Sequence, residues 1–320
     1  MDRAPEAACH LVWLARSPAS RALVGGKGAS LSRLAMLGAP VPPAFALTTY
    51  AYAQVAESLS LPRHASDIAD EDLPRLRALI TGASLPGSVT ESITQAFEEL
   101  QILVGREIAL AVRSSATAED AVEFSFAGLH DTVLDVRSLP ALEAAVKQCW
   151  ASLWSERAVA YRRAGGFATD DAAMAVVVQQ LIQSDVSFVV FTADPVSGRD
   201  QHLVIAATWG LGEAVVSGLV VPDHVVVGPD GDVVEYTVGD KHLMVIPGAR
   251  PEEGAREVPV PRALRMVPVL SDAQVTAIAT MARGLSPRLG YEADLEGAIA
   301  GGALYLFQAR PITTLGPRVD

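Results

Sequence analysis

Short apolar runs rich in valine and isoleucine dominate the second half of the chain and constrain its fold more than any other feature. They are, in chain order, MAVVVQQLI, VSFVVFTADP, HLVIAATWG, DHVVVG and DVVEYTV. Runs of this length and composition, bounded by turn residues, are typical of buried β-strands. The turn sequence GPDGD between the last two runs predicts a hairpin. A closing strand is predicted in GALYLFQARPI, which ends at Pro311.

The first half of the chain has the periodicity of helices instead. Leu31, Leu34 and Ala35 recur at the spacing of one helical face, and Gly38 is a typical helix stop. A second amphipathic pattern predicts one long helix over about residues 139–163. Helices followed by a strand-rich half indicate an α+β fold whose two parts meet near residue 180, and such a junction is a common place for a ligand.

Two further segments in the second half have clear local signals. The sequence SDAQ at residues 271–274 has the Ser-x-x-Gln spacing of a capping box and predicts the start of a helix. Residues 248–262 hold three prolines and are predicted to form a loop.

Composition excludes several classes of protein. A chain of 320 residues, half of them apolar, can bury a large core in one or two domains. The net charge of −12 argues against a general nucleic-acid binder. No apolar run approaches the roughly 20 residues of a membrane span, and the N-terminus lacks a secretory pattern. Cys9 and Cys149 have neither metal-site nor disulfide spacing, so a cytoplasmic, reducing environment is expected.

Two stretches of the first half could hold an anion. In GGKGAS, glycines beside a helix start allow backbone N–H groups to approach an anion, and Lys27 adds a full charge. The alternative is a glycine turn with a surface lysine. In LAVRSSATAED an apolar run ends at Arg113, followed by hydroxyl residues that could hold phosphate. The alternative is an ion pair of Arg113 with Glu119 or Asp120.

Two stretches of the second half carry carboxylates. Glu213 lies in the glycine-rich sequence TWGLGEAVVSG, where it could take a metal or a ribose hydroxyl or could simply cap a helix. In the last two predicted strands, Asp294 and Glu296 share one face, as do Gln308 and Arg310. If these strands pair, an oxygen-rich patch suited to Mg²⁺ results beside one cation. The alternative is a surface ion pair of Glu296 with Arg310.

Five motifs occur in a fixed order along the chain. They are GGKGASLSRLAMLGAPVPPAFALTT, VRSSATAED with SFAGLHDT, FTADPVSG, GLGEAVVSGLVVPD and QARPITTL. In this order they resemble the N-terminal ATP-binding domain of the phosphoenolpyruvate synthase, pyruvate phosphate dikinase and rifampin phosphotransferase family, over about residues 10–316. The resemblance implies an ATP-grasp-like fold of two lobes with the nucleotide cleft between them. Residues 1–180 would form the N-terminal lobe and residues 181–320 the C-terminal lobe.

The resemblance also implies roles for individual residues, with ATP and Mg²⁺ as cofactors. Lys27, Arg113 and Arg310 would contact the phosphates and serve catalysis. The other implied contacts are Gly128 and Thr132 at the phosphate loop, Gln179, Gln180 and Leu181 at the adenine, Glu213 at the ribose, and Glu296 and Gln308 at Mg²⁺. Three positions depart from the family pattern: glutamine is common where Leu129 stands, a small residue where Phe188 stands, and tryptophan where Gly297 stands.

In this family the domain splits ATP into AMP and two phosphates, and the β-phosphoryl group passes to a histidine on a separate domain. The implied function is therefore the ATP-binding part of a dikinase-type phosphotransferase. Its expected partners are a histidine-bearing phosphocarrier and an acceptor-binding domain, with neither nucleic acid nor membrane. Two alternatives stay open: a stand-alone ATP-dependent enzyme acting on a small molecule, and a non-catalytic ATP-binding scaffold.

Overall fold

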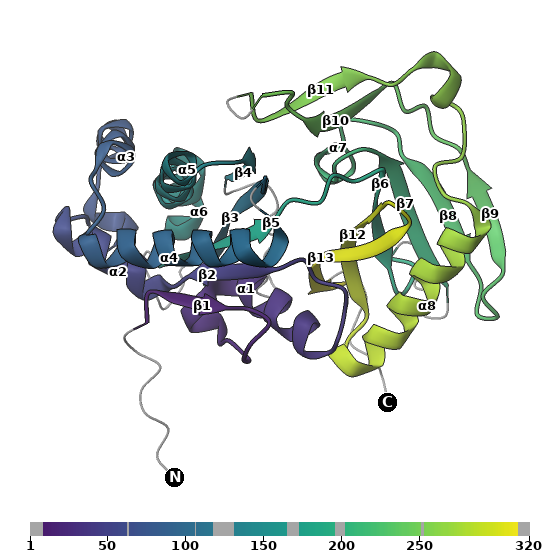
Figure 1. The fold of residues 1–320 in the computed structure, drawn as a ribbon, viewed down its shortest axis with the longest axis horizontal. Coiled ribbons are helices and arrows are strands. Elements are labelled where there is room, and N and C mark those ends of the chain that lie inside the picture. Colours follow the sequence, from purple (N-terminus) through teal and green to yellow (C-terminus); the bar gives the residue numbers. More distant parts are fainter. Residues whose placement is uncertain are drawn as a thin grey trace, which may run out of the picture. The chain divides into compact units, whose positions relative to one another are not determined.

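The computed structural model of the chain describes residues 9–62, 64–105, 107–117, 131–164, 173–195, 202–250 and 253–312. These residues form helices and antiparallel sheets in two compact units (Figure 1). The first unit comprises residues 1–33 and 43–181, and the second comprises residues 34–42 and 182–320. Each unit has its own hydrophobic core. The predicted mixture of helices and sheets is confirmed.

A five-stranded antiparallel sheet of order β1-β2-β5-β3-β4 forms the frame of the first unit. Its strands are β1 (Leu11–Trp13), β2 (Ala44–Leu47), β3 (Leu110–Ala116), β4 (Thr132–Val136) and β5 (Met174–Gln180). The helices are α1 (Arg21–Met36), α2 (Thr49–Ser58), α3 (Leu73–Gly82), α4 (Gly87–Val104), α5 (Leu139–Ser152) and α6 (Glu156–Ala164), with short 3₁₀ turns η1 (Ala65–Asp67) and η2 (Asp70–Asp72).

Alternation along the strands divides the side chains of this sheet between two faces. Val112 and Val178 belong to the core cluster that also includes residues of α2 to α6. Val177 points to the other face, where its methyl group lies 3.5 Å from the place a Cβ of Gly28 would occupy. Helix α1 therefore covers the face opposite the main core.

The second unit contains a six-stranded antiparallel sheet of order β13-β12-β6-β7-β8-β9 and a separate hairpin of β10 and β11. The strands are β6 (Val186–Phe191), β7 (Leu203–Trp209), β8 (Asp223–Val227), β9 (Val233–Thr237), β10 (Leu243–Pro247), β11 (Ala255–Pro259), β12 (Ala293–Ala300) and β13 (Ala303–Pro311). The helices are α7 (Glu213–Val216), the 3₁₀ turn η3 (Arg262–Leu264) and α8 (Asp272–Leu289), which runs along the sheet (Figure 1).

Helix α8 packs its apolar side on one face of the six-stranded sheet. Ile278 and Ala282 of α8 share a core cluster with Phe188 of β6, Ile205 of β7 and Leu295 of β12. The predicted capping box starts this helix, because Ser271 Oγ accepts a hydrogen bond from Gln274 N and Gln274 Oε1 accepts one from Ser271 N. Residues 294, 296 and 298 alternate with 295 and therefore belong to the face opposite α8.

The local predictions for the second half of the chain are confirmed with one exception. The apolar runs form β5 to β9, and Gly228 N donates to Asp232 O across the predicted hairpin turn. The predicted loop over residues 248–262 is wrong, because residues 255–259 form β11 and pair with β10. Both strands of this two-stranded sheet are edges, which tolerate Pro247 and Pro259 at their ends.

Two helix predictions in the first unit also need correction. The predicted helix over residues 139–163 is two helices, because Ser155 turns the chain and its Oγ accepts a hydrogen bond from Ala158 N at the start of α6. Helix α1 begins at Arg21, before the glycines that were predicted to precede it. Its first turn is separated from the rest by a kink at Gly25, where φ is 69° and ψ is −177°.

Candidate functional site

The kink of α1 docks against the end of strand β3 in the first unit. Ser115 Oγ donates to Val24 O at 2.8 Å and accepts from Gly28 N at 3.1 Å. A Cβ on Gly25 would lie 2.1 Å from Ser115 O, so only glycine allows this approach. The glycines of GGKGAS thus have a structural role that holds the second part of α1 against β3.

The same region brings together most of the described cations and hydroxyls that were predicted to bind phosphate. Lys27 Nζ donates to Ser114 O at 3.0 Å, and Ser114 Oγ donates to Asp131 O at 3.0 Å. Arg113 stands opposite Thr132 of β4 and opposite Val177 of β5. Directly opposite side chains share a face, so Arg113 belongs to the face that α1 covers. The predicted phosphate-loop residue Gly128 lies outside the described residues.

The predicted adenine contacts lie at the end of β5. Gln180 N donates to Pro43 O at 3.0 Å and Leu181 N donates to Ala109 O at 2.8 Å, which holds this backbone in the sheet. Gln179 is opposite Ala111 and shares the face of Arg113. Among the described residues, its buried Nε2 has no hydrogen-bond partner. Because an unsatisfied buried donor costs roughly 1–3 kcal/mol, this amide could serve a ligand.

In the second unit, β12 and β13 bring four polar side chains together on the face opposite α8. The strands pair with Glu296 opposite Gln308 and Asp294 opposite Arg310. Arg310 Nε donates to Asp294 Oδ2 at 2.8 Å, and Arg310 Nη2 donates to Glu296 Oε1 at 3.2 Å. The two strands pair, so the condition for an oxygen-rich patch beside one cation is met, and the ion pair joins two buried carboxylates to a partly exposed Arg310.

This patch has the donor chemistry that a hard cation requires. Two carboxylates and an amide are available from Asp294, Glu296 and Gln308, each exposed by less than a tenth of its surface. Mg²⁺ usually takes one or two carboxylates and completes its shell with water and phosphate oxygens. The part of the chain that the structure describes has no group of three or more His, Cys, Asp and Glu side chains that could hold a metal. A cation at this patch would therefore be held by two carboxylates and an amide.

Glu213 starts the short helix α7 and is exposed. The turn that precedes it lies close to β6, since Ser187 Oγ donates to Gly210 O at 2.6 Å. Ser187 is opposite Ala298 of β12 and therefore shares the face of Glu296. Glu296, Gln308 and Arg310 therefore share one face of the six-stranded sheet. Glu213 is not in the sheet and directly follows the turn that Ser187 contacts on that face.

Cysteine chemistry does not contribute to this set. The thiol of Cys149 is buried beneath β3 and donates to Val112 O at 3.7 Å. Burial, followed by the charge of Asp131, raises the pKa of Cys149 to about 12. No helix within the described ranges is long and apolar enough to cross a membrane.

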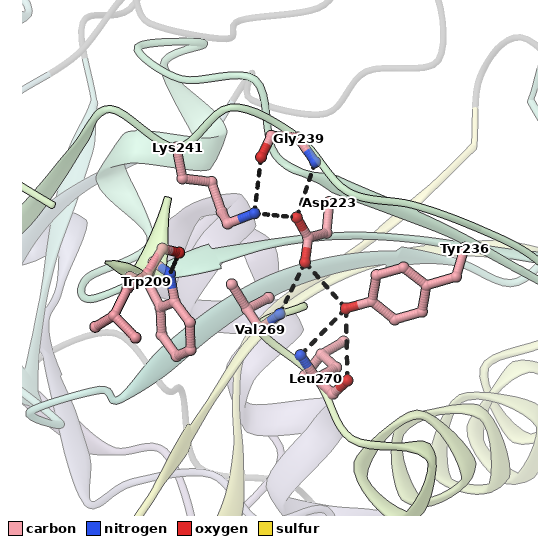
Figure 2. A network of polar contacts seen from close by, with 8 residues as sticks. Trp209, Asp223, Tyr236, Gly239, Lys241, Val269 and Leu270 are labelled. Atoms are coloured by element: carbon pink, nitrogen blue, oxygen red, sulfur yellow. Dashed lines mark hydrogen bonds and ion pairs between the residues drawn. The ribbon is translucent and has the colours of Figure 1, made fainter. Parts of the chain in front are cut away.

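Sequence reasoning missed one buried ion pair in the second unit, Lys241 with Asp223 (Figure 2). Both side chains are fully buried. Aspartate and lysine are ordinary surface residues, so neither stood out. The only local signal is the position of Asp223 as the first residue of a predicted strand, directly after Pro222.

Comparison with known proteins covers nearly the whole chain. Residues 21–320 match the family described as pyruvate phosphate dikinase, AMP/ATP-binding domain. The chain is 38% identical over 311 residues to a probable phosphoenolpyruvate synthase of Methanothermobacter thermautotrophicus, covering 93% of this chain and 45% of that protein. It is 40% identical over 308 residues to a rifampicin phosphotransferase of Streptomyces sviceus, covering 92% of this chain and 35% of that protein.

Two further similarities complete the comparison. A phosphoenolpyruvate synthase of Pyrococcus furiosus is 36% identical over 346 residues, which cover 92% of this chain and 42% of that protein. The chain thus spans less than half the length of these curated relatives. Among solved structures, D-alanyl-alanine synthetase A of Vibrio cholerae aligns over 91% of this chain and 58% of that one, with a TM-score of 0.35 and 12% identity. That similarity is too low to bear on the fold.

Proposed function

This chain belongs to the pyruvate phosphate dikinase AMP/ATP-binding domain family, and from that premise we propose that it is the ATP-binding part of a dikinase-type phosphotransferase. It binds Mg·ATP, cleaves it to AMP and phosphate, and passes the β-phosphoryl group to a histidine on a separate carrier domain or protein. The family also supports an ATP-grasp-like fold. The set of buried Asp294, Glu296 and Gln308 with the partly exposed Arg310 is the single observation that carries the proposal.

Placing charged side chains in the interior costs free energy, so this set needs a compensating partner. Moving two carboxylates out of water costs several kcal/mol per ion, and hydrophobic residues of similar volume would often be as stable. Arg310 contacts both Asp294 and Glu296 and offsets part of their charge. A nucleotide phosphate with its metal ion would complete the balance, since the metal would engage the carboxylates and Arg310 could turn to phosphate oxygens.

Mg²⁺ fits the donors that are present. Glu296 and Gln308 would hold it, and Asp294 lies beside them on the same face. A bound Mg²⁺ would neutralise charge that develops on the phosphate oxygens. The protein contributes positioning: the pairing of β12 with β13 and with β6 fixes both strands, so the donors need little rearrangement on binding.

Catalysis of phosphoryl transfer depends mostly on orientation and charge. In our proposal Lys27, Arg113 and Arg310 hold the phosphates, and Gly128 and Thr132 belong to the phosphate loop. Lys27 is held by Ser114 O, which supports its place beside Arg113. Gln179, Gln180 and Leu181 contact the adenine, and the unsatisfied amide of Gln179 supports this. Glu213 accepts hydrogen bonds from the ribose hydroxyls.

We propose that the partners of this chain are a histidine-bearing phosphocarrier and an acceptor-binding domain. The chain covers 35–45% of the relatives described above, which leaves most of their length for other functions. A carrier histidine would attack the β-phosphorus of ATP through Nε2 or Nδ1, and water would cleave the bond between the β- and γ-phosphates, which releases the γ-phosphate as inorganic phosphate and leaves the β-phosphoryl group on the histidine. As the histidine attacks, the bond between the β-phosphorus and the AMP oxygen breaks. AMP then leaves with the bond electrons.

The test is a calorimetric titration of the chain with Mg·ATP, beside the variant Glu296→Gln. This change keeps the size of the side chain and removes one negative charge. We expect micromolar binding that is lost in the variant. The matched control is Glu257→Gln, an exposed glutamate of β11 in the same unit, which should bind as the unchanged chain does. Equal binding by Glu296→Gln would refute the assignment of the site.

Turnover needs a second experiment. ATP labelled at the β-phosphorus is incubated with the chain and a histidine-bearing carrier domain from one of the relatives. Acid-labile label on the carrier, together with AMP, supports the dikinase reaction. ADP formed with a small acceptor would favour a stand-alone enzyme, and binding without any product would favour a scaffold.

A further inference from the structure

The ion pair of Lys241 and Asp223 is the centre of a closed network of hydrogen bonds in the second unit (Figure 2). Lys241 Nζ donates to Asp223 Oδ1 and, at 2.8 Å, to Gly239 O. Gly239 N donates to the same carboxylate oxygen at 3.0 Å. Both charged side chains have no exposed surface. The loop of residues 239–241 is therefore folded around the carboxylate of Asp223.

The other oxygen of Asp223 joins two more segments. Oδ2 accepts from Tyr236 OH at 3.0 Å and from Val269 N at 2.8 Å. Tyr236 OH also accepts from Leu270 N at 3.2 Å. Burial is the main cause that raises the pKa of Tyr236 to about 12, so this hydroxyl keeps its proton at neutral pH. One carboxylate thus connects β8, β9, the loop before β10 and the segment before α8.

The network is connected to both flanks of helix α7, through β10 before the helix and through Asp223 after it. On the side before α7, Leu211 N donates to Val245 O of β10 at 2.8 Å. Gly210 has a φ of 76°, and a Cβ there would lie 2.4 Å from Val245 O. Strand β10 begins two residues after Lys241. The position of Lys241 therefore fixes the start of the strand that Gly210 and Leu211 contact.

On the side after α7, the chain runs through residues 217–222 into Asp223 itself. Gly239 packs on the backbone of this stretch, since a Cβ on Gly239 would lie 2.2 Å from Val221 O and 2.3 Å from Pro222 O. The segment that carries α7 is consequently held at its beginning through β10 and at its end through Asp223. Between these two anchors, α7 is only four residues long and Glu213 is its first residue.

We propose that the buried pair of Asp223 and Lys241 is a positioning device that fixes helix α7 and thereby aims Glu213 at the ribose of the nucleotide. This inference rests on the ribose role of Glu213 in the proposed function. A buried pair of this kind contributes little net stability compared with an apolar pair, and its best attested use is to select one arrangement of the chain. Here it selects the arrangement of the loops on either side of α7.

The experiment compares dissociation constants for Mg·ATP with those for Mg·2′-deoxyATP and Mg·3′-deoxyATP. The variants are Glu213→Ala, Lys241→Met and the milder Tyr236→Phe, which removes one hydrogen bond from Asp223. We expect the unchanged chain to prefer ATP on the order of tenfold, the value of a charged hydrogen bond. Glu213→Ala should abolish this preference. Lys241→Met should reduce it several-fold while affinity for the deoxynucleotides stays unchanged.

Tyr52→Phe is the matched control for Tyr236→Phe, because Tyr52 is a buried tyrosine of the first unit whose OH accepts from Trp154 Nε1 at 2.9 Å. It should lower stability and leave the preference for ATP intact. If Lys241→Met does not fold, Tyr236→Phe decides, with a smaller loss of preference expected.

The two possible failures are distinguishable. An unchanged preference in Glu213→Ala would overturn the ribose role and with it this inference. Loss of preference in Glu213→Ala, with full preference kept in folded Lys241→Met or Tyr236→Phe, would overturn the positioning role alone.

Discussion

Helix α1 can approach β3 because Gly25 has no Cβ at the point of contact. Gly25 touches the carbonyl of Ser115, a residue far away in the chain, and both hydrogen bonds of Ser115 Oγ go to the backbone of α1. Lys27 follows the kink by two residues and is held by the neighbouring carbonyl of Ser114. The placement of a proposed phosphate ligand therefore depends on the close approach of Gly25 to Ser115.

We predict that Gly25→Ala lowers the free energy of unfolding by about 2 kcal/mol or more and weakens Mg·ATP binding. It adds both strain at a positive φ and a clash with backbone. Gly38→Ala is the control, because Gly38 has a φ of 75° and nothing lies within 4 Å of its Cβ position. Urea denaturation and calorimetry of both variants measure the effects. An equal loss in the two variants would mean that the contact with Ser115 contributes nothing.

Two of the three departures expected from the resemblance, Phe188 and Gly297, are neighbours in the structure, and the third, Leu129, lies outside the described residues. Gly297 is directly opposite Phe188 on the neighbouring strand, and a Cβ on Gly297 would lie 2.5 Å from the Phe188 ring. On the face opposite Glu296, the large side chain is Phe188 of β6, and the facing position of β12 is Gly297. Phe188 therefore fills the core at this position, and the residue that follows the proposed metal ligand Glu296 in β12 is a glycine.

Cysteine reactivity gives a second prediction for single residues. A pKa of about 12 leaves roughly one Cys149 in ten thousand as thiolate at pH 8, and the thiol is buried. Iodoacetamide at pH 8 should therefore label exposed Cys9 and spare Cys149 in the native protein. Mass spectrometry measures this, with guanidinium-unfolded protein as the control in which both react. Rapid native labelling of Cys149 would contradict the burial.

Among the elements, α8 depends most clearly on its own sequence. The reciprocal bonds of Ser271 and Gln274 satisfy N–H groups that would otherwise be unpaired at the helix start. The apolar side of the helix then covers the core face of the six-stranded sheet. The opposite face of the same sheet carries the proposed metal ligands, so the capping of α8 should affect stability and not chemistry.

We expect Ser271→Ala to lower the free energy of unfolding by about 1 kcal/mol, the usual value of an N-cap. Affinity for Mg·ATP should stay within twofold of the unchanged value. The control is Thr276→Ala in the same helix, an exposed residue whose hydroxyl bonds only to Asp272 O. It should be neutral or slightly stabilising. A large loss of ATP affinity in Ser271→Ala would show that α8 acts on the site.

At the scale of the whole molecule, ligand binding and folding are linked. A ligand that binds only the folded chain raises the free energy of unfolding by about 2.7 kcal/mol at a concentration of 100 times its dissociation constant. If Mg²⁺ binds with ATP through Glu296 and Gln308, both components are needed for the full effect. The carboxylates otherwise repel the phosphates.

The melting temperature should therefore rise by several degrees with Mg·ATP, and by much less with ATP plus EDTA. Differential scanning calorimetry measures both, and Glu296→Gln should show the small rise in either condition. An equal rise with and without magnesium would contradict the metal assignment and leave ATP binding in place.

Sequence by itself determined the family and most elements of the second half of the chain. Strands β5 to β9, β12 and β13, the hairpin at GPDGD and the capping box of α8 follow from residue spacing, because each depends on neighbours within a few positions. Alternation also placed Asp294 with Glu296 on one strand face and Gln308 with Arg310 on another, whereas the pairing of the two strands and the register of Glu296 opposite Gln308 came from the structure. The roles of the site residues toward ATP stay predictions that the titrations above test.

Only the tertiary structure decided what the local pattern left open. It broke one predicted helix at Ser155 and made β11 from a proline-rich stretch, because pairing with β10 outweighs weak local preference. It also buried Lys241 against Asp223 and brought Gly25 onto Ser115. These contacts join residues that no local period relates. The first buries two charges, which the fold tolerates because they are paired and hydrogen-bonded, and the second requires two backbones to approach closely. Such contacts exist only once the chain has folded back on itself.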